Sequence, residues 1–333
     1  MGSNFLRSRQ KHFTIASESL TCSFYYIKNF KCELFKVAYQ VNNRIKNTTG
    51  NEMKVDNLDL YLLNDGSFKV DGGALFGQTP KDHWGKLVKI DTRNRITLGL
   101  NIVLIKNGNK NILIDSGVGN KFTDVMMDQY AIKGNRVQRA LKKLGLTGMD
   151  IDIVILTHLH FAHAGGLTKS NRNGALIPTF PNAKHIIQED AWQHAMNPNE
   201  RNSALFFKND LQLLSDLGLV ELIKGDHEVF QGINILKTDG PSQGHQIVEV
   251  GNRARKVVFL GDLVPTKWHL NLNWISSLDQ EPEITLGCKR RLLLQAEKEG
   301  WLILFSHGYP SRAGTLIRQG GRIILQPETI DSE

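Results

Sequence analysis

Three histidines within six residues are the feature of this sequence most able to do chemistry. His158, His160 and His163 precede the pair Gly165-Gly166, which allows close backbone packing beneath them. Neutral imidazole is the commonest protein ligand for zinc-like metals. His158 and His160 are two residues apart, so on an extended loop they point the same way, and His163 turns in from the start of the next segment. This spacing predicts a metal site.

The elements that would position such a site can be read from apolar runs. Residues 151–156 form an apolar run typical of a buried strand, so the histidines follow its end. Residues 256–260 form a second such run that ends at Asp262, and residues 301–305 a third that ends at His307. Loops at strand ends rest on a rigid platform, which favours them as places for functional groups.

The histidine segment resembles the signature of the metallo-β-lactamase superfamily, His-x-His-x-Asp-His followed by Ala-Gly-Gly. Every position matches except Ala162, which stands where the signature has aspartate. The resemblance extends over about residues 55–326 and is closest to lactonase and organophosphate-hydrolase-like members. It implies an α/β fold, a four-layer αββα sandwich of the metallo-β-lactamase type.

The resemblance also implies a ligand set. Asp262 matches an aspartate that bridges two metals, and His307 matches the last histidine ligand. Residues 238–245 align with a segment whose first histidine is a ligand, but Pro241 occupies that position. Each of the two metals has therefore lost one ligand, to Ala162 and to Pro241.

Two further residues are expected to support the ligands from behind. Asp115 follows an apolar strand and matches a family aspartate beneath the metal loop, where it would hold a ligand's far nitrogen or the loop backbone. His245 matches a histidine that is usually structural.

The remaining candidate ligands form two sets, each of two histidines and Asp262. One set has His158 and His160, and the other has His163 and His307. Three protein ligands with open positions suit Zn²⁺, Fe²⁺ or Mn²⁺. Because one carboxylate serves both sets, we expect one or two weakly bound ions, with Asp262 and His163 taking a direct part in catalysis.

Three functions follow from this pattern. The first is a metallohydrolase that cleaves an ester, lactone or phosphoester of a small molecule with metal-activated water. The second is a pseudoenzyme, a degenerate member retained as a binding or regulatory module. The third is a mononuclear metal protein that uses a two-His-one-carboxylate set for redox or oxygen chemistry.

Composition excludes several other classes. The 333 residues carry a formal charge of +8, but residues 1–51 hold eight Lys and Arg against two Glu, so most of the excess lies there. We therefore expect no nucleic-acid partner. The sequence contains no run of eighteen apolar residues, so no membrane span is predicted. Three cysteines are too few for a disulfide framework, which fits a reducing compartment. A homodimer is left open.

The domain organisation is expected to be simple. Residues 1–52 are predicted to be a basic N-terminal extension, and residues 53–333 a metallo-β-lactamase-like domain. The extension is interpreted as disordered, as a targeting segment or as a mis-assigned start. We expect a cytoplasmic location, or an organellar one if the extension is a transit peptide.

Local patterns predict further elements. Residues 58–63 read as a strand, 64–66 as a turn, and 203–218 as a helix. The substrate loops are predicted over 72–95 and 263–275. The aromatic residues of these loops are Phe76, Trp84, Trp268 and Trp274. We interpret them as core or dimer contacts in preference to substrate contacts.

Overall fold

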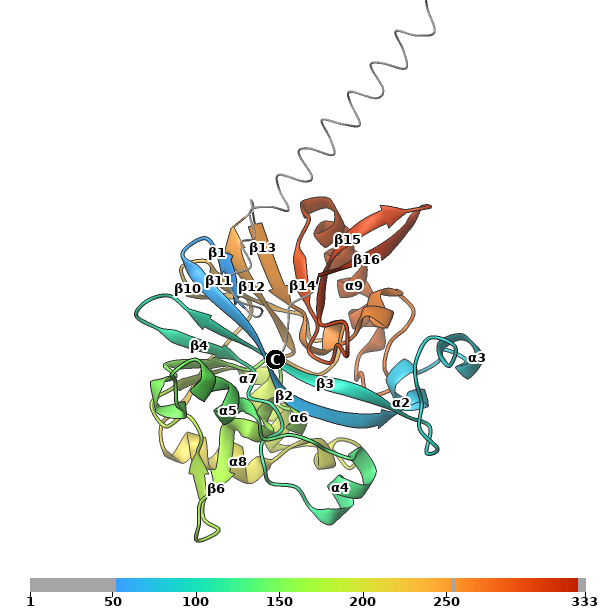
Figure 1. Ribbon diagram of the computed structural model, residues 1–333. Coiled ribbons are helices and arrows are strands. Elements are labelled where there is room, and N and C mark those ends of the chain that lie inside the picture. Colours follow the sequence, from blue (N-terminus) through green and yellow to red (C-terminus); the bar gives the residue numbers. More distant parts are fainter. Residues whose placement is uncertain (1–51, 253–254, 329–333) are drawn as a thin grey trace, which may run out of the picture. The chain divides into compact units, whose positions relative to one another are not determined.

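The structure is a computed structural model that describes residues 52–252 and 255–328 (Figure 1). The chain separates into two units, residues 1–46 and 47–333, and every described residue belongs to the second. Apart from Glu52, the predicted N-terminal extension lies outside the described residues.

Within the described ranges, two seven-stranded sheets organise the domain. The first has the order β1 (Glu52–Val55), β2 (Leu58–Asp71), β3 (Arg95–Lys106), β4 (Asn111–Ile114), β5 (Ile153–Ile155), β8 (Lys184–Gln188) and β9 (Val220–Ile223). The second has the order β10 (His227–Phe230), β11 (Ile233–Lys237), β12 (Gln246–Asn252), β13 (Arg255–Phe259), β14 (Leu302–Leu304), β15 (Ala313–Gln319) and β16 (Arg322–Glu328). A small sheet pairs β6 (Thr168–Ser170) with β7 (Leu176–Pro178).

The helices connect and cover these strands. They are α2 (Gly72–Phe76), α3 (Lys81–Trp84), α4 (Asp124–Tyr130), α5 (Val137–Lys143), α6 (Phe161–Ala164), α7 (Glu189–Met196), α8 (Lys208–Asp216) and α9 (Pro282–Glu299). The longest, α9, begins with proline at its first position, where the missing N–H costs no hydrogen bond, and ends at Gly300 in the left-handed conformation.

The core lies between the two sheets. One hydrophobic cluster joins Leu60 and Val103 of the first sheet to Val248 and Phe259 of the second, all fully buried or nearly so. Outside it, α5, α7 and α8 pack on the first sheet and α9 packs on the second. Both sheets are thus covered on two faces, which explains their near-continuous apolar strands. This arrangement confirms the predicted αββα sandwich.

Two local predictions were wrong. Residues 64–66 do not form a turn, because β2 runs through them with a register shift between Asn64 and Ser67. Asp65 is fully buried there and accepts hydrogen bonds from the backbone N–H groups of Val118, Arg136 and Val137. The helix expected over 203–218 is shorter, since α8 begins only at Lys208 after a single 3₁₀ turn.

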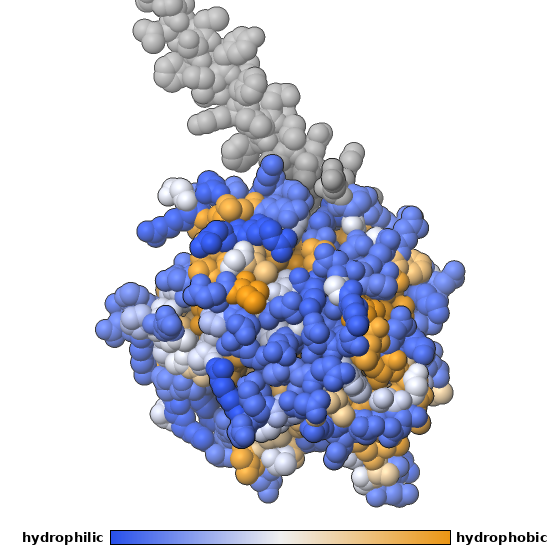
Figure 2. Space-filling model, turned by 180° about the vertical axis from the view of Figure 1, so that it is seen from behind, coloured by the Kyte–Doolittle hydropathy of each residue, from blue (hydrophilic) through white to orange (hydrophobic). Residues whose placement is uncertain are grey.

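No helix among the described residues is both long and apolar enough to span a bilayer. Seen from behind, the surface is mainly hydrophilic, with hydrophobic side chains gathered in separate patches (Figure 2).

Candidate metal centre

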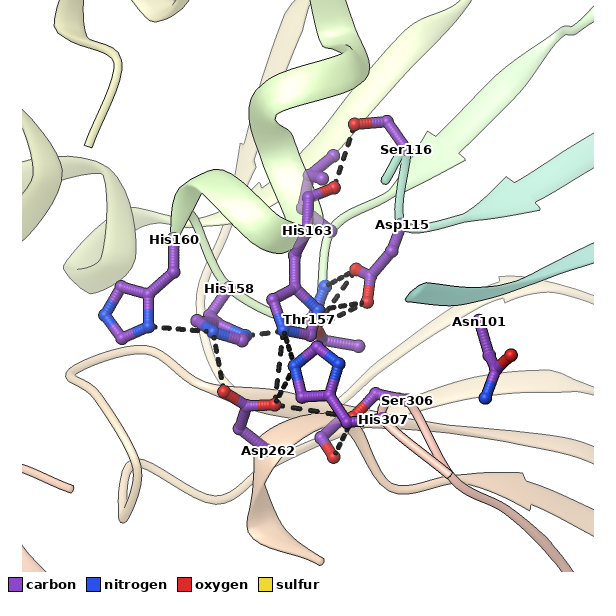
Figure 3. Close-up of polar contacts among 12 residues, drawn as sticks. Asn101, Asp115, Ser116, Thr157, His158, His160, His163, Asp262, Ser306 and His307 are labelled. Carbon is purple, nitrogen blue, oxygen red and sulfur yellow. Dashed lines mark hydrogen bonds and ion pairs between the residues drawn. The ribbon is translucent and has the colours of Figure 1, made fainter. Parts of the chain in front are cut away.

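The three histidines of the loop lie where β5 ends. His158 and His160 follow β5, with His160 on extended backbone, and His163 lies in α6. Because β5 is paired in parallel with both β4 and β8, its end is fixed on both sides. All three side chains are buried, and their rings turn toward a common centre (Figure 3).

The second sheet brings the other two candidates to the same place. Asp262 lies in a 3₁₀ turn after β13, and His307 follows β14. These strands are paired in parallel, so their carboxyl ends meet at one edge of the sheet. His307 is buried, whereas the Asp262 side chain keeps 24% of its surface exposed. Side chains from both sheets therefore converge, as the sequence predicted.

Within the described ranges, two groups of side chains have ligand atoms within 4.8 Å of one another: His158, His160 and Asp262, and His163, Asp262 and His307. In the first group, Nε2 of His158 lies 3.1 Å from Nδ1 of His160 and 3.4 Å from Oδ2 of Asp262. In the second, Nε2 of His163 lies 3.1 Å from Nε2 of His307, and each lies 3.2 Å from Oδ1 of Asp262.

These separations fit a metal ion. Ligands about 2.0–2.1 Å from a tetrahedral ion stand roughly 3.3 Å apart. The second group also needs a cation. Nδ1 of His163 lies 2.7 Å from the Asp115 carboxylate, and Nδ1 of His307 lies 2.8 Å from the carbonyl oxygen of Gly99. Both partners only accept, so each Nδ1 carries a proton. A second proton on Nε2 of His163, or a metal ion in its place, therefore has to lie among the three facing atoms.

The first group is less strictly fixed. The Thr157 hydroxyl donates to Asp115 and can accept from Nδ1 of His158 at 3.1 Å. However, Nδ1 of His160 can donate its proton to Nε2 of His158, which satisfies that contact without an ion. The far nitrogen of His160, Nε2, is buried and has no hydrogen-bond partner among the described residues. The second group is therefore the better organised ligand set.

Asp115 supports the loop from beneath. Its backbone has a φ of 60°, and its carboxylate accepts from Nδ1 of His163 and from both the N–H and the hydroxyl of Thr157. Gly166 packs below, so closely that a Cβ there would lie 2.1 Å from the carbonyl oxygen of Ser116. Asp115 therefore orients a candidate ligand and the start of the loop together.

His245 contacts the site without facing it. Its Nδ1 lies 2.6 Å from the Thr238 hydroxyl, and its Nε2 accepts from the backbone N–H of Asp262 at 3.0 Å. It therefore fixes the turn that carries Asp262, and its two ring nitrogens are both engaged. Neither Ala162 nor Pro241 offers a donor atom, although both line the cavity in front of the histidines.

The charges at the site favour a cation. Burial disfavours an imidazolium at His163, but Asp262 and Asp115 outweigh it and raise the pKa of His163 to about 10. For Asp262, burial opposes ionisation, yet His163 and His307 hold the pKa of the carboxyl well below its usual range. Burial, assisted by the neighbouring His163, lowers the pKa of His158 to about 3, so that imidazole stays neutral and able to ligate.

The cavity reaching this site is lined mainly by apolar side chains. They include Phe68, Leu75, Leu98, Phe161, Leu205 and Leu278. The sequence did not single these out, and it also missed Tyr130 and Asp279, which line the same cavity. By contrast, Phe76, Trp84 and Trp274 are buried in one cluster against which Trp268 packs, as core residues would be.

Comparisons with known proteins agree with this geometry. The model of the metallo-beta-lactamase superfamily matches residues 96–307. An N-acyl homoserine lactonase of Bacillus thuringiensis is 31% identical over 174 residues, which are 52% of this chain and 62% of that protein. The chain thus spans less than two thirds of the length of this curated relative.

Two solved structures extend the likeness. A probable metal-dependent hydrolase from Staphylococcus aureus is 30% identical, with a TM-score of 0.75 over 82% of this chain and 99% of that one. An N-acyl homoserine lactone hydrolase, described with the product N-hexanoyl-L-homoserine bound at its catalytic metal centre, is 25% identical. Its TM-score is 0.57 over 79% of this chain and 95% of that one.

Proposed function

The chain belongs to the metallo-β-lactamase superfamily, and on that basis we propose that it is a metal-dependent hydrolase of a lactone or a related ester. One observation carries the proposal. Nε2 of His163, Nε2 of His307 and Oδ1 of Asp262 lie 3.1–3.2 Å apart, which is close to the spacing of ligands around one tetrahedral ion. The lactone class is taken from the N-acyl homoserine lactonases that the chain resembles.

The ion is proposed to be a single Zn²⁺ held by His163, Asp262 and His307. Imidazole and carboxylate suit Zn²⁺, and Fe²⁺ or Mn²⁺ fit the same two-His-one-carboxylate set. His158 and His160 would have to share Asp262 with that set, so a second ion is expected to bind more weakly.

When bound, the ion would lower the pKa of a water molecule and polarise the substrate carbonyl oxygen. The chain's own residues prepare for this. Asp115 and the Gly99 carbonyl hold the two imidazole rings in the ligating tautomer. Asp262 and His163 would act directly, because both belong to the proposed ligand set and line the cavity. The apolar lining excludes bulk water and would contact the acyl group of the substrate.

A second function, a catalytically degenerate binding module, is favoured by Ala162 and Pro241, which remove two donor atoms from the cavity. The two functions differ in a simple experiment. Protein purified without chelator is analysed for metal and then assayed on N-acyl homoserine lactones and aryl esters with added Zn²⁺, Mn²⁺ or Fe²⁺. The hydrolase is expected to hold one equivalent and to lose activity on chelation.

Two variants sharpen that test. His307→Ala is expected to abolish both tight metal binding and hydrolysis, because it removes one of three ligands. His227→Ala, on the exposed strand β10, is the control and is expected to change neither. A well-folded protein that takes up no divalent ion and cleaves none of these substrates would favour the binding module.

A further inference from the structure

Ester hydrolysis raises a question that the candidate ligands do not answer. When the bond between the acyl carbon and the leaving oxygen breaks, the leaving alkoxide needs a proton. Four of the titratable residues lining the cavity belong to the proposed ligand sets: His160, His163, Asp262 and His307. Among the described lining residues, the remaining titratable groups are Tyr130 and Asp279.

We propose that Asp279 is a catalytic residue, the proton donor to the leaving alkoxide. This inference rests on the proposed hydrolase function. Hydroxide adds to the acyl carbon, the bond from that carbon to the leaving oxygen breaks, and its electron pair stays on that oxygen. The oxygen takes the proton of the Asp279 carboxyl. The next water then returns a proton to Asp279 as it becomes hydroxide, so each turnover consumes one water.

The position of Asp279 is fixed by its neighbours. Its side chain is buried, with 8% exposed, and its Oδ2 accepts from the Thr285 hydroxyl at 2.7 Å. The next two residues bind the loop of residues 240–241: the N–H of Gln280 donates to the carbonyl of Pro241 at 3.1 Å. Asp279 is thereby held beside the place where Pro241 stands in the cavity wall.

The loop of residues 240–241 packs tightly against the start of α9. A Cβ added at Gly240 would lie 2.4 Å from the Thr285 hydroxyl oxygen, so the loop rests directly on the first turn of α9. Thr285 restrains one carboxyl oxygen of Asp279, and no ligand atom of Asp279 lies within either group of convergent donors among the described residues. The geometry therefore favours a group that serves the substrate over a metal ligand.

The surroundings of Asp279 bring its pKa close to neutral pH, so a large fraction of the carboxyl groups carries a proton there. Burial raises the pKa of its carboxyl to about 7, and the Asp262 carboxylate adds to the rise. The Thr285 hydroxyl and the Lys289 ammonium act in the opposite direction. A general acid works best when its pKa lies near the working pH. Burial raises the pKa of Tyr130 from its ordinary value near 10, which makes the phenol a poorer match.

The test compares two esters of the same acyl group, one with a p-nitrophenolate leaving group and one with an alkyl alcohol. A good leaving group needs no proton, whereas an alkoxide does. Asp279→Asn is expected to lower kcat for the alkyl ester by about 10²–10⁴-fold and to change kcat for the aryl ester by less than about tenfold. Tyr130→Phe is expected to change both rates by the same factor.

A second readout does not depend on activity. Infrared difference spectroscopy of the Zn²⁺-loaded protein is expected to show a protonated carboxyl band that titrates near neutral pH and is missing in Asp279→Asn. Thr285→Val is expected to move that titration to higher pH, because it removes a hydrogen bond that stabilises the carboxylate. A band that titrates near pH 4 in the wild type would overturn the proposal.

The other outcomes are equally distinct. Equal losses on both esters in Asp279→Asn, a selective loss in Tyr130→Phe, or a lower Zn²⁺ content in Asp279→Asn would each overturn the role of Asp279. If the wild type cleaves both esters and Asp279→Asn keeps both rates, only this role fails. If the wild type cleaves neither ester at any metal loading, the proposed hydrolase function fails with it.

Discussion

Replacing Asp115 by asparagine tests how the second ligand group is organised. Asparagine keeps the size of the side chain and tolerates the positive φ of 60° at this position. It has only one accepting oxygen, however, while the carboxylate accepts from both Thr157 and Nδ1 of His163. If the amide NH₂ faces His163, Nδ1 must become the acceptor and the proton moves to Nε2, which removes the lone pair that would bind the ion.

The size of the effect follows from these contacts. Loss of a partner behind a ligating histidine typically lowers metal affinity by about 10–100-fold. Each tenfold change corresponds to about 1.4 kcal/mol. If the NH₂ faces Thr157 instead, the unsatisfied buried N–H costs about 1–3 kcal/mol of folding free energy. Competition with a chromophoric chelator gives the Zn²⁺ dissociation constant, and denaturant unfolding with excess chelator gives the stability.

Asp65→Asn is the matched control. Asp65 is another fully buried carboxylate that accepts backbone N–H groups, those of Val118, Arg136 and Val137, and it has no hydrogen bond to any candidate ligand. Its replacement is expected to lower stability while leaving the Zn²⁺ dissociation constant within about twofold, by the independence of distant sites. If Asp115→Asn folds and binds Zn²⁺ as tightly as the wild type, Asp115 does not set the tautomer of His163.

Three further predictions follow from particular residues. Ala162→Asp combined with Pro241→His is expected to raise Zn²⁺ from one to two equivalents per chain, measured by elemental analysis, because both positions line the cavity of the ligand sets. Burial lowers the pKa of Lys289 to about 7, although Asp279 opposes the shift, so the unfolded chain binds its proton more tightly. The wild type is therefore expected to gain stability relative to Lys289→Met as pH rises from 7 to 10.5, measured by denaturant titration. Gly166→Ala would place a Cβ 2.1 Å from a backbone carbonyl oxygen, so it is expected to lower the free energy of unfolding by about 1–3 kcal/mol. Gly287→Ala lies in open space in α9 and is expected to raise it by up to about 1 kcal/mol. Thermal unfolding measures both.

The sequence was informative where chemistry and local pattern coincide. His158, His160 and His163 could be placed at a strand end because an apolar run precedes them. Asp262 and His307 each end an apolar run, and the resemblance implied that they join the histidines. The structure brings them together because β13 and β14 are parallel neighbours. The four-layer fold was implied by the resemblance to the metallo-β-lactamase superfamily.

What the sequence could not give depends on contacts between distant residues. The segment 64–66 has the composition of a turn, yet it continues β2 because Asp65 finds its donors more than fifty residues away. Asp279 has no motif around it, and its place in the cavity comes from hydrogen bonds of its neighbours to the loop of residues 240–241 and from Thr285. Local sequence patterns do not predict such contacts between residues that are distant in the sequence.

The retained contacts behind the ligands bear on whether the site is still used. Nε2 of His163, Nε2 of His307 and Oδ1 of Asp262 lie 3.1–3.2 Å apart, so a positive charge has to lie among them. That charge is either the second proton of a His163 imidazolium, since against the effect of burial the pKa of His163 is raised to about 10 by Asp262 and Asp115, or a divalent ion. A change of tautomer at His307 would relieve this contact, but the carbonyl of Gly99 requires a proton on Nδ1. At His163, the Asp115 carboxylate imposes the same requirement. Ala162 and Pro241 leave this arrangement intact, so a divalent ion can still bind there by displacing the Nε2 proton of His163.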